Sequence, residues 1–424
     1  MISGPFAVLG AESLAGDAEA HFQATDVTQW KPAFAAPYSG PHSLSADAAK
    51  SYSFTATAFL GLRVADQLEA YLNPELAQGV PFSDLTGLAG FTNGELARTS
   101  GSRPKLYRAR VFARRTWNHG GDWQEVESEA NQLRGRVREQ RTVLTVGNFA
   151  VGDVFDHNAY SRDARAQFLN WALIGHGAYD FAADARGYTY GVSLEHFGSG
   201  WAVRAGRFAQ PRQPNQQQLD GAWFRHYGDE VEIERSWILG VAPGTARVLL
   251  FRNRAVMARY DDALRTASQP PSLDDVRDRE QAKSGVGLNV EQAVGEQAGA
   301  FLRAMWADGR TETYAYTEVD RSVSGGVLLK GVAWGRQPDS AGIAFARNLL
   351  SRDHREYLAR GGLGFFLGDG RLAYRPEDVL EAFYAWSPRR GLTFTADFQR
   401  VVAPGYNGDR GPVRFVGARA HIEF

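Results

Sequence analysis

The stretch KLYRARVFARRTW, residues 105–117, decides the fold class. One parity carries Arg108, Arg110, Phe112 and Arg114, and the other carries mostly small apolar side chains. Successive side chains of a β-strand point to opposite faces, so this alternation predicts a strand. A soluble sandwich would expose the arginines to water and bury the apolar face. A membrane barrel would turn the apolar face to lipid and the arginines to a wet lumen.

The same alternation recurs from one end of the chain to the other. Clear examples are SYSFTATAFLGLR at 51–63, LEAYLNPEL at 68–76, GYTYGVSLE at 187–195, LTFTADFQ at 392–399 and the closing segment 416–424. We count about sixteen such segments. Most are roughly ten residues long, which is the length that a tilted strand needs to cross a bilayer.

The connections between these segments alternate in length. Long connections are expected at 31–50, 79–104, 150–185, 211–228, 257–283, 308–320, 349–374 and 403–411. Tight turns are expected at 64–67, 198–200, 242–244, 295–297, 336–338 and 388–391, with the polar stretch 118–139 as a longer exception. This asymmetry is typical of up-and-down barrels in outer membranes, and an even strand count places both termini at the short-turn, periplasmic side.

The predicted fold is therefore all-β: a transmembrane antiparallel up-and-down β-barrel of about sixteen strands. Residues 18–424 are expected to form a single outer-membrane domain, and residues 1–17 an N-terminal periplasmic segment. The opening MISGPFAVLG is too short and uncharged for a complete signal peptide, so the numbering is expected to describe a mature chain without one.

Composition excludes several classes of function. A formal net charge of −1 with no long basic run argues against a nucleic-acid partner. The absence of cysteine leaves no disulfide framework and no thiolate metal site. Apolar windows of about 18 residues are absent, which excludes a transmembrane helix. The spacing of His157, His176 and His196 matches no standard ligand set, so neither a metal nor a cofactor is expected.

A series of stretches, taken in order, covers nearly the whole chain. They are PYSGPHSLSADAAKSYSFTATAFLGLR, NPELAQG, GLAGFTNGE, KLYRARVFARRTW, LTVGNFAVGDVFDHNAYSRDARAQFLNWAL, RTETYAYTEVDRSVSGGVLLKG, GGLGFFLGDGRLAYRPEDVLEAFYAW and PGYNGDRGPVRFVGARAHIEF. Together they resemble the carbohydrate-selective porin family (OprB-type). The resemblance implies a sixteen-stranded outer-membrane porin through which small, glucose-like sugars diffuse passively into the periplasm.

Sugars are neutral, polar and ringed, so a channel that favours them needs weak hydrogen-bonding sites and flat surfaces along its wall. Arginine offers a planar fork of donors that also stacks, and carboxylates accept from hydroxyls. Mixed charges would keep the lumen near neutral. The inward parity supplies the candidate pore-lining, sugar-binding residues: Arg108, Arg110, Arg114, Phe112, Glu69, Tyr71, Asn73, Glu75, Glu195, Arg204, Glu291, Arg303, Asp397, Arg419 and His421.

The third long loop, 150–185, is expected to fold inward and narrow the channel, as the resemblance also implies. Ser161 is a candidate helix N-cap, and the apolar residues at 164, 168, 171 and 172 follow at near-helical spacing. The candidate residues of this constriction loop are Asp153, Asp156, Arg162, Asp163, Arg165, Phe168 and Trp171.

Other functions stay open at the level of sequence. A channel for polysaccharide export or for small organic acids is the main alternative to a sugar porin, and a barrel with a plugged lumen is another. An outer-membrane enzyme is disfavoured because no serine, histidine and acid converge on one strand neighbourhood. The expected partners are small sugars and outer-membrane lipid, and the chain is either a monomer or a homotrimer.

Overall fold

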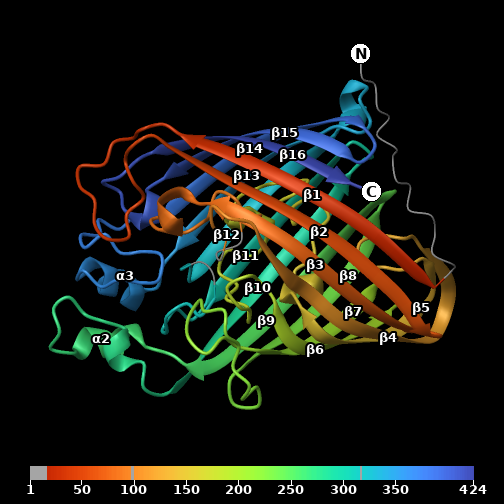
Figure 1. Ribbon diagram of the computed structural model, residues 1–424, viewed down its shortest axis with the longest axis horizontal. Coiled ribbons are helices and arrows are strands. Elements are labelled where there is room, and N and C mark those ends of the chain that lie inside the picture. The colour runs from red at the N-terminus through yellow and green to blue at the C-terminus, as the bar shows by residue number, and fades with distance from the viewer. Residues whose placement is uncertain (1–16, 97–99, 316–317) are drawn as a thin grey trace.

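The computed structural model describes residues 17–96, 100–315 and 318–424, and these form a closed antiparallel barrel (Figure 1). Each strand pairs with its neighbours in sequence, and the first strand closes the barrel against the last. The predicted all-β, up-and-down barrel is confirmed, including the strand count of sixteen over the described residues. The expected segment 1–17 lies outside the described residues except for Asp17.

The strands are β1 (Ala18–Lys31), β2 (Ala49–Ala65), β3 (Leu68–Val80), β4 (Lys105–Val126), β5 (Gly135–Phe149), β6 (Thr189–Gly198), β7 (Trp201–Ala209), β8 (Tyr227–Leu239), β9 (Ala242–Val256), β10 (Glu280–Val294), β11 (Ala298–Ala307), β12 (Arg321–Lys330), β13 (Ser340–Leu349), β14 (Glu377–Arg389), β15 (Leu392–Val402) and β16 (Val413–Glu423). The helices in the described part are α1 (Trp171–Ile174), α2 (Tyr260–Arg265) and α3 (Arg352–Ala359), with 3-10 turns η1 (Phe82–Leu85), η2 (Val151–Asp153), η3 (Asp274–Val276), η4 (Gly331–Trp334) and η5 (Pro404–Tyr406). Of these helices, none has the length and apolar character that crossing a membrane requires.

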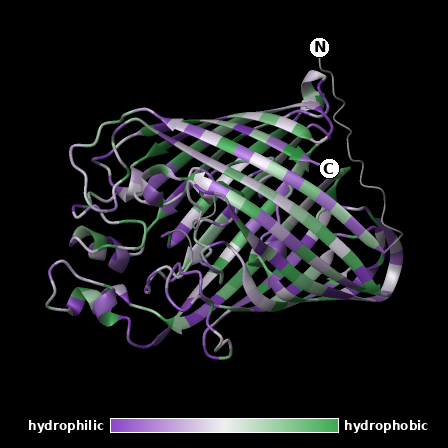
Figure 2. Ribbon diagram, in the orientation of Figure 1, coloured by the Kyte–Doolittle hydropathy of each residue, from purple (hydrophilic) through white to green (hydrophobic). Residues whose placement is uncertain are grey.

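Side chains along the strands alternate between an apolar outer face and a polar inner face. Figure 2 shows hydrophobic and hydrophilic residues alternating in bands along the strands. Val111, Leu194 and Ile233 are exposed on the outside, whereas Glu232 and Arg303 are buried inside. Exposed apolar side chains in a continuous belt fit lipid, and buried charges fit a polar lumen.

Long loops and short turns lie at opposite ends of the barrel. The loops with α2 and α3 extend from one end, while β1 begins and β16 ends at the other, as Figure 1 shows. The turns at 66–67, 199–200 and 390–391 are as tight as predicted. Two differ from the prediction: the β8–β9 turn is 240–241, and the β12–β13 connection, 331–339, is long enough to hold η4.

The polar stretch 118–139 is mostly strand, so its assignment as a connection is wrong. Strands β4 and β5 continue as a long hairpin that remains paired as far as Val126 and Gly135. Backbone hydrogen bonds order this hairpin where few apolar side chains are available. The remaining turn, 127–134, folds back over the barrel end, where the backbone N–H of Arg134 donates to Glu19 Oε1 on β1 at 3.1 Å.

A β-bulge in β4 reverses the parity predicted for its first residues. Arg108 and Arg110 pair with consecutive residues of β3, so Ala109 between them has no partner. The β3 residue opposite Arg108 is Pro74, which has no N–H to give to the ladder, and prolines in sheets occur at edges and bulges. The prediction that Arg108 lines the lumen is wrong, because its Nη2 donates at 2.8 Å to the hydroxyl of Tyr190 on the outer face.

The loop 150–188 enters the barrel, but the helix expected from Ser161 is wrong. The only helix within it is α1, whose N-cap is Asn170, and residues 163–167 form a turn. The barrel wall replaces helical hydrogen bonding, since the Glu381 carboxylate of β14 accepts the backbone N–H groups of Leu169 and Asn170 at 2.5 and 2.8 Å. A buried carboxylate that takes two N–H groups fixes an extended backbone there instead of a helix.

Candidate functional site

One side of the lumen, formed by β6 to β10, carries a continuous row of ion pairs that we call the paired wall. Arg204 contacts Glu195, Glu232 and Glu234 at 2.9, 3.1 and 3.0 Å. Arg247 continues the row to Glu234 at 2.8 Å and to Glu291 at 3.2 Å. Cross-strand neighbours in the barrel bring these side chains together. The charged side chains of the paired wall therefore bind one another, which leaves them less available to a solute.

The adjoining part of the wall, formed by β3 to β5, has arginines without carboxylate partners, and we call it the open wall. Tyr71 and Phe112 stack with ring centroids 4.8 Å apart. The guanidinium carbon of Arg114 lies 5.2 Å from the Tyr71 centroid and 5.4 Å from that of Phe112. Arg141 of β5 lies over Phe197 at 4.0 Å. These arginines present both a donor fork and a flat face.

The loop 150–188 is anchored to the wall by buried polar contacts. Asp156 accepts from Arg303 Nε at 3.0 Å and from Asn289 Nδ2 at 2.6 Å. Phe168 packs edge-on against Phe383 with centroids 5.0 Å apart. Such a dense anchorage holds the loop inside the barrel as a fixed part of the wall, so most of the inward residues behind it cannot meet a solute.

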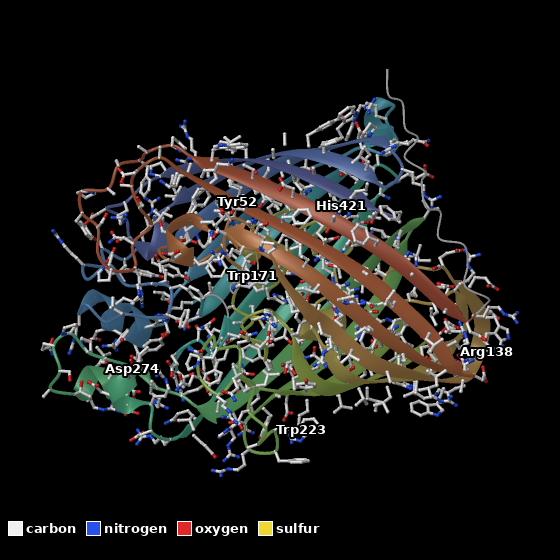
Figure 3. All side chains as sticks on the ribbon, in the orientation of Figure 1. Tyr52, Arg138, Trp171, Trp223, Asp274 and His421 are labelled. Carbon is white, nitrogen blue, oxygen red and sulfur yellow. The ribbon has the colours of Figure 1, made fainter. Side chains whose placement is uncertain are left out.

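The described residues line three larger cavities along the barrel. An outer cavity of about 620 Å³ lies among the long loops, at residues such as Gln213, Asp274 and Tyr357. A middle cavity of about 220 Å³ is lined by Trp171, Phe181 and Tyr188, among others. An inner cavity of about 390 Å³ lies towards the short turns. In Figure 3 the labelled Asp274 and Arg138 mark the loop end and the turn end, with Trp171 between them.

The junction between the middle and inner cavities is an ion pair. Arg110 lines the middle cavity and Asp153 lines the inner one. The Arg110 fork donates from Nε and Nη2 to the two Asp153 oxygens at 2.7 and 2.8 Å. Burial alone would raise the pKa of Asp153, but the Arg110 guanidinium holds it below its ordinary value. The bidentate geometry makes this pair a strong, charged contact between the two spaces.

The predicted site residues fall into three groups. Glu69, Phe112, Arg114, Glu195, Asp153 and Arg162 line the inner cavity, and Arg110 and Trp171 line the middle one. The others that face inward are covered by neighbours and line neither cavity: Tyr71, Asn73, Glu75, Arg204, Glu291, Arg303, Asp397, Arg419, His421, Asp156, Arg165 and Phe168. Asp163 is exposed on the turn of the loop, and Arg108 lies on the outer face.

The covered residues hold the structure together. Arg419 of β16 donates to the backbone oxygens of Ala164 and Gln167 at 2.6 and 2.9 Å. Arg165 donates to Glu95 at 2.8 Å and lies 3.6 Å from Glu75. These contacts join the loop 150–188 to strands on both sides of the seam between β1 and β16. Inward parity alone did not predict solute contact, because side chains that face inward can be occupied by this loop.

Sequence reasoning missed several residues of the lumen, among them Glu232, Glu234 and Arg247 of the paired wall and the two that follow. Arg141 lies on β5, just after the stretch 118–139 that was assigned to a connection, and it lines the inner cavity. Tyr107 was placed on the outer parity, but beyond the bulge it turns inward and donates its hydroxyl to Glu75. Pro74 in the neighbouring strand was the available signal for the second case, because a proline inside a strand indicates a bulge.

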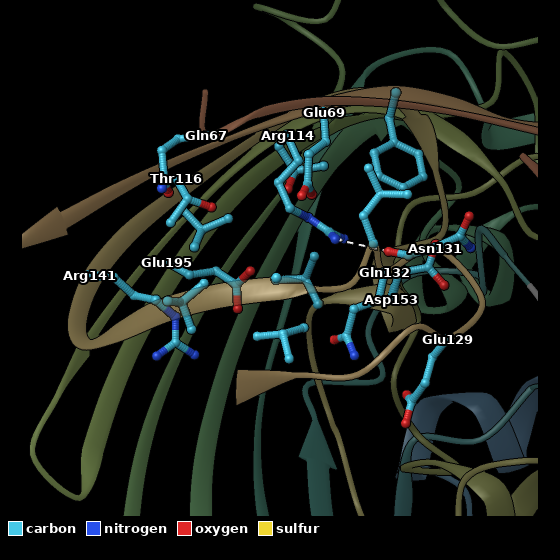
Figure 4. A pocket seen from close by; sticks show the side chains of 18 of the residues that line it. Gln67, Glu69, Arg114, Thr116, Glu129, Asn131, Gln132, Arg141, Asp153 and Glu195 are labelled. Atoms are coloured by element: carbon cyan, nitrogen blue, oxygen red, sulfur yellow. Dashed lines mark hydrogen bonds between the residues drawn. The ribbon is translucent and has the colours of Figure 1, made fainter. Parts of the chain in front are cut away.

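Figure 4 shows the inner cavity, with Arg114 pointing to Asn131 and Arg141 beside Glu195. The turn 127–134 closes part of it, since Arg114 Nη1 donates to the Asn131 backbone oxygen at 2.9 Å and Asn73 Nδ2 donates to the Asn131 side chain at 2.9 Å. Within the part of the chain that the structure describes, no cluster of histidine and acidic side chains has the geometry to hold a metal ion. The site is therefore built from forks, carboxylates and ring faces.

Comparison with known proteins agrees with this architecture. The chain is similar to the structure of Pseudomonas putida OprB at high pH, with 15% identity and a TM-score of 0.74 over 96% of this chain and 94% of that one. It is also similar to the outer membrane channel DcaP of Acinetobacter baumannii, with 11% identity and a TM-score of 0.53 over 98% and 99%. At such identities the likeness shows the fold alone.

No curated protein matches the chain. Residues 47–424 match the family described as carbohydrate-selective porin, OprB family, and that range covers every strand from β2 to β16. A match over most of the sequence assigns the family. The chain belongs to the OprB family of carbohydrate-selective porins.

Proposed function

We propose that this protein is a passive channel of the bacterial outer membrane through which small carbohydrates of glucose size diffuse into the periplasm. The observation that carries the proposal is the row of cavities inside the barrel, with ring faces in the middle cavity and arginine forks with carboxylates in the inner one. Weak, successive sites of this kind suit a solute that must both enter and leave.

The middle cavity supplies the flat surfaces. Trp171 and Phe181 stack with centroids 6.2 Å apart and an interplanar angle of 25°. Sugar rings have C–H faces that pack on aromatic rings, while their hydroxyls stay free to hydrogen-bond with the wall. A pore narrowed to cavities of a few hundred Å³ by an anchored loop argues against polysaccharide export.

Swelling of liposomes that contain the purified protein tests the proposal. Glucose-sized sugars should enter faster than amino acids of similar size, and trisaccharides should enter much more slowly because the middle cavity is small. Equal rates for sugars and amino acids would leave only a general diffusion pore. The absence of swelling with every solute would show a plugged barrel.

Cysteine labelling on intact cells tests the direction in which the barrel lies. The sequence contains no cysteine, so single cysteines at Asp66, Arg390 and Asp409 have no background. The first two positions lie in short turns and should resist an impermeant reagent, whereas the third lies in the β15–β16 loop and should react. The opposite pattern would place the long loops in the periplasm.

A further inference from the structure

The inner cavity is lined by arginines that lack carboxylate partners. Arg114, Arg141 and Arg162 line it, and among the described residues no ion pair within 4 Å involves any of them. Arg141 Nη1 donates to the backbone oxygens of Arg138 and Glu139 at 3.0 and 3.3 Å. Their positive charges therefore face the cavity without neutralisation by direct contact.

Arg162 is held in the same state by neutral acceptors. Its Nη2 donates to the Gly152 backbone oxygen at 2.5 Å, and its Nη1 lies 3.0 Å from His157 Nδ1. Burial, together with the charge of Arg162, lowers the pKa of His157 to about 3. The imidazole is consequently neutral at ordinary pH and accepts from Arg162 without adding or removing charge.

The carboxylates of the inner cavity are already engaged, for the most part by arginines outside its lining. Asp153 is bound by Arg110 and Glu195 by Arg204. Glu69 accepts the Tyr71 hydroxyl at 2.7 Å and faces Arg63 at 3.9 Å. The remaining lining carboxylate, Glu129, lies exposed on the turn 127–134. Guanidinium groups without carboxylate partners, rather than carboxylates without cationic partners, thus dominate this space.

An open guanidinium fork matches a carboxylate in shape and charge, and a low-dielectric cavity strengthens that attraction. Phe112 and Phe197 line the same cavity, so a ring can pack on them while its acid group meets a fork. The inner cavity, at about 390 Å³, also has the size of a small-molecule site. The arginines without carboxylate partners give this cavity a positive character, which differs from the near-neutral lumen expected from the sequence.

We propose that the inner cavity favours monosaccharides that carry a carboxylate, such as uronates and aldonates, over neutral sugars of the same size. The inference rests on the proposed function, because it names the sugars that the same channel passes best. Arg114 of β4 and Arg141 of β5 bind the acid group in turn, and Arg162 does so from the loop 150–188.

Uptake of radiolabelled glucuronate and glucose into proteoliposomes at equal salt tests this preference. Glucuronate should enter the wild-type vesicles faster than glucose. Arg141→Gln and Arg114→Gln should each slow glucuronate about fivefold more than they slow glucose, which is the factor that one contact between unit charges is worth in water. Arg252→Gln, on the outer face of β9, is the matched control and should change neither rate.

Two results would overturn the inference: glucuronate entering the wild type no faster than glucose, or the Arg141 and Arg114 variants slowing both sugars equally. Having two separate variants guards against a single misfolded one, and heat-dependent migration in detergent gels reports a folded barrel. If neither sugar enters the wild-type vesicles, the proposed function itself fails, which is a distinct outcome from the loss of preference alone.

Discussion

The paired wall and the open wall face the same lumen but use their arginines differently. Arg204 shares its fork among three carboxylates at 2.9 to 3.1 Å, whereas Arg114 and Arg141 meet backbone oxygens and ring faces. Charges that satisfy one another stiffen a wall, and charges without partners remain available to a solute. The difference shows that the role of an inward arginine depends on which side chains face it from the neighbouring strands.

The largest expected effect breaks the paired wall. Arg204→Ala leaves Glu195 and Glu232 without a guanidinium, and removing one partner from buried ion pairs costs about 3–5 kcal/mol of unfolding free energy. Urea unfolding of the barrel in lipid vesicles measures this loss. The control is Arg252→Ala on the outer face, which should stay within about 0.5 kcal/mol of the parent. Equal losses of unfolding free energy in both variants would mean that the ion pairs of the paired wall do not stabilise the barrel.

The next effect sharpens the comparison at the junction of the cavities. Arg110→Ala removes the fork that binds Asp153, so apparent sugar affinity should fall several-fold, in line with about 1 kcal/mol for a lost hydrogen bond. Cation conductance in planar bilayers should rise, because Asp153 is left unbalanced.

Arg108→Ala and Val111→Ala are the controls for that experiment, since both side chains lie on the outer face. Neither change should alter sugar affinity or ion selectivity. If Arg108→Ala alters them as much as Arg110→Ala does, the bulge at Ala109 is misplaced and the parity continues unbroken along β4.

The pH response of the same variant gives a smaller effect. Arg110 holds the pKa of Asp153 below its ordinary value against the effect of burial. Without Arg110, burial raises that pKa, so the carboxyl takes up a proton at a higher pH than in the parent. Cation conductance of Arg110→Ala should therefore fall on mild acidification, at pH values where the parent conductance stays flat. A flat profile in the variant would show that Asp153 is well hydrated.

The smallest expected effect concerns the turn beneath the open wall. Asn131→Ala removes the side-chain bond to Asn73 but keeps the backbone oxygen that Arg114 binds. Stability should fall by about 1 kcal/mol or less, and amide hydrogen exchange in 127–134 should quicken. Unchanged exchange would mean that Arg114 and the contacts to β1 hold the turn alone.

The barrel could be predicted from the sequence because it depends on a pattern that repeats in every strand, whereas the family was indicated by the resemblance of a series of stretches along the chain. Alternating side chains and alternating loop lengths fix which face meets lipid and which end carries the loops. The entry of the loop 150–188 into the barrel was also predicted, and six of its seven named residues lie buried or half-buried there.

Only the tertiary structure decided which inward residues a solute can reach. The sequence determined the parity of Arg303 and Arg419, but their cover comes from a loop that is distant in sequence. Parity itself failed at Ala109, because a bulge depends on the partner strand and its Pro74. A strand's pattern is local and therefore legible in the sequence, whereas pairing of charges, register shifts and loop packing arise from contacts between distant segments and appear only when the barrel closes.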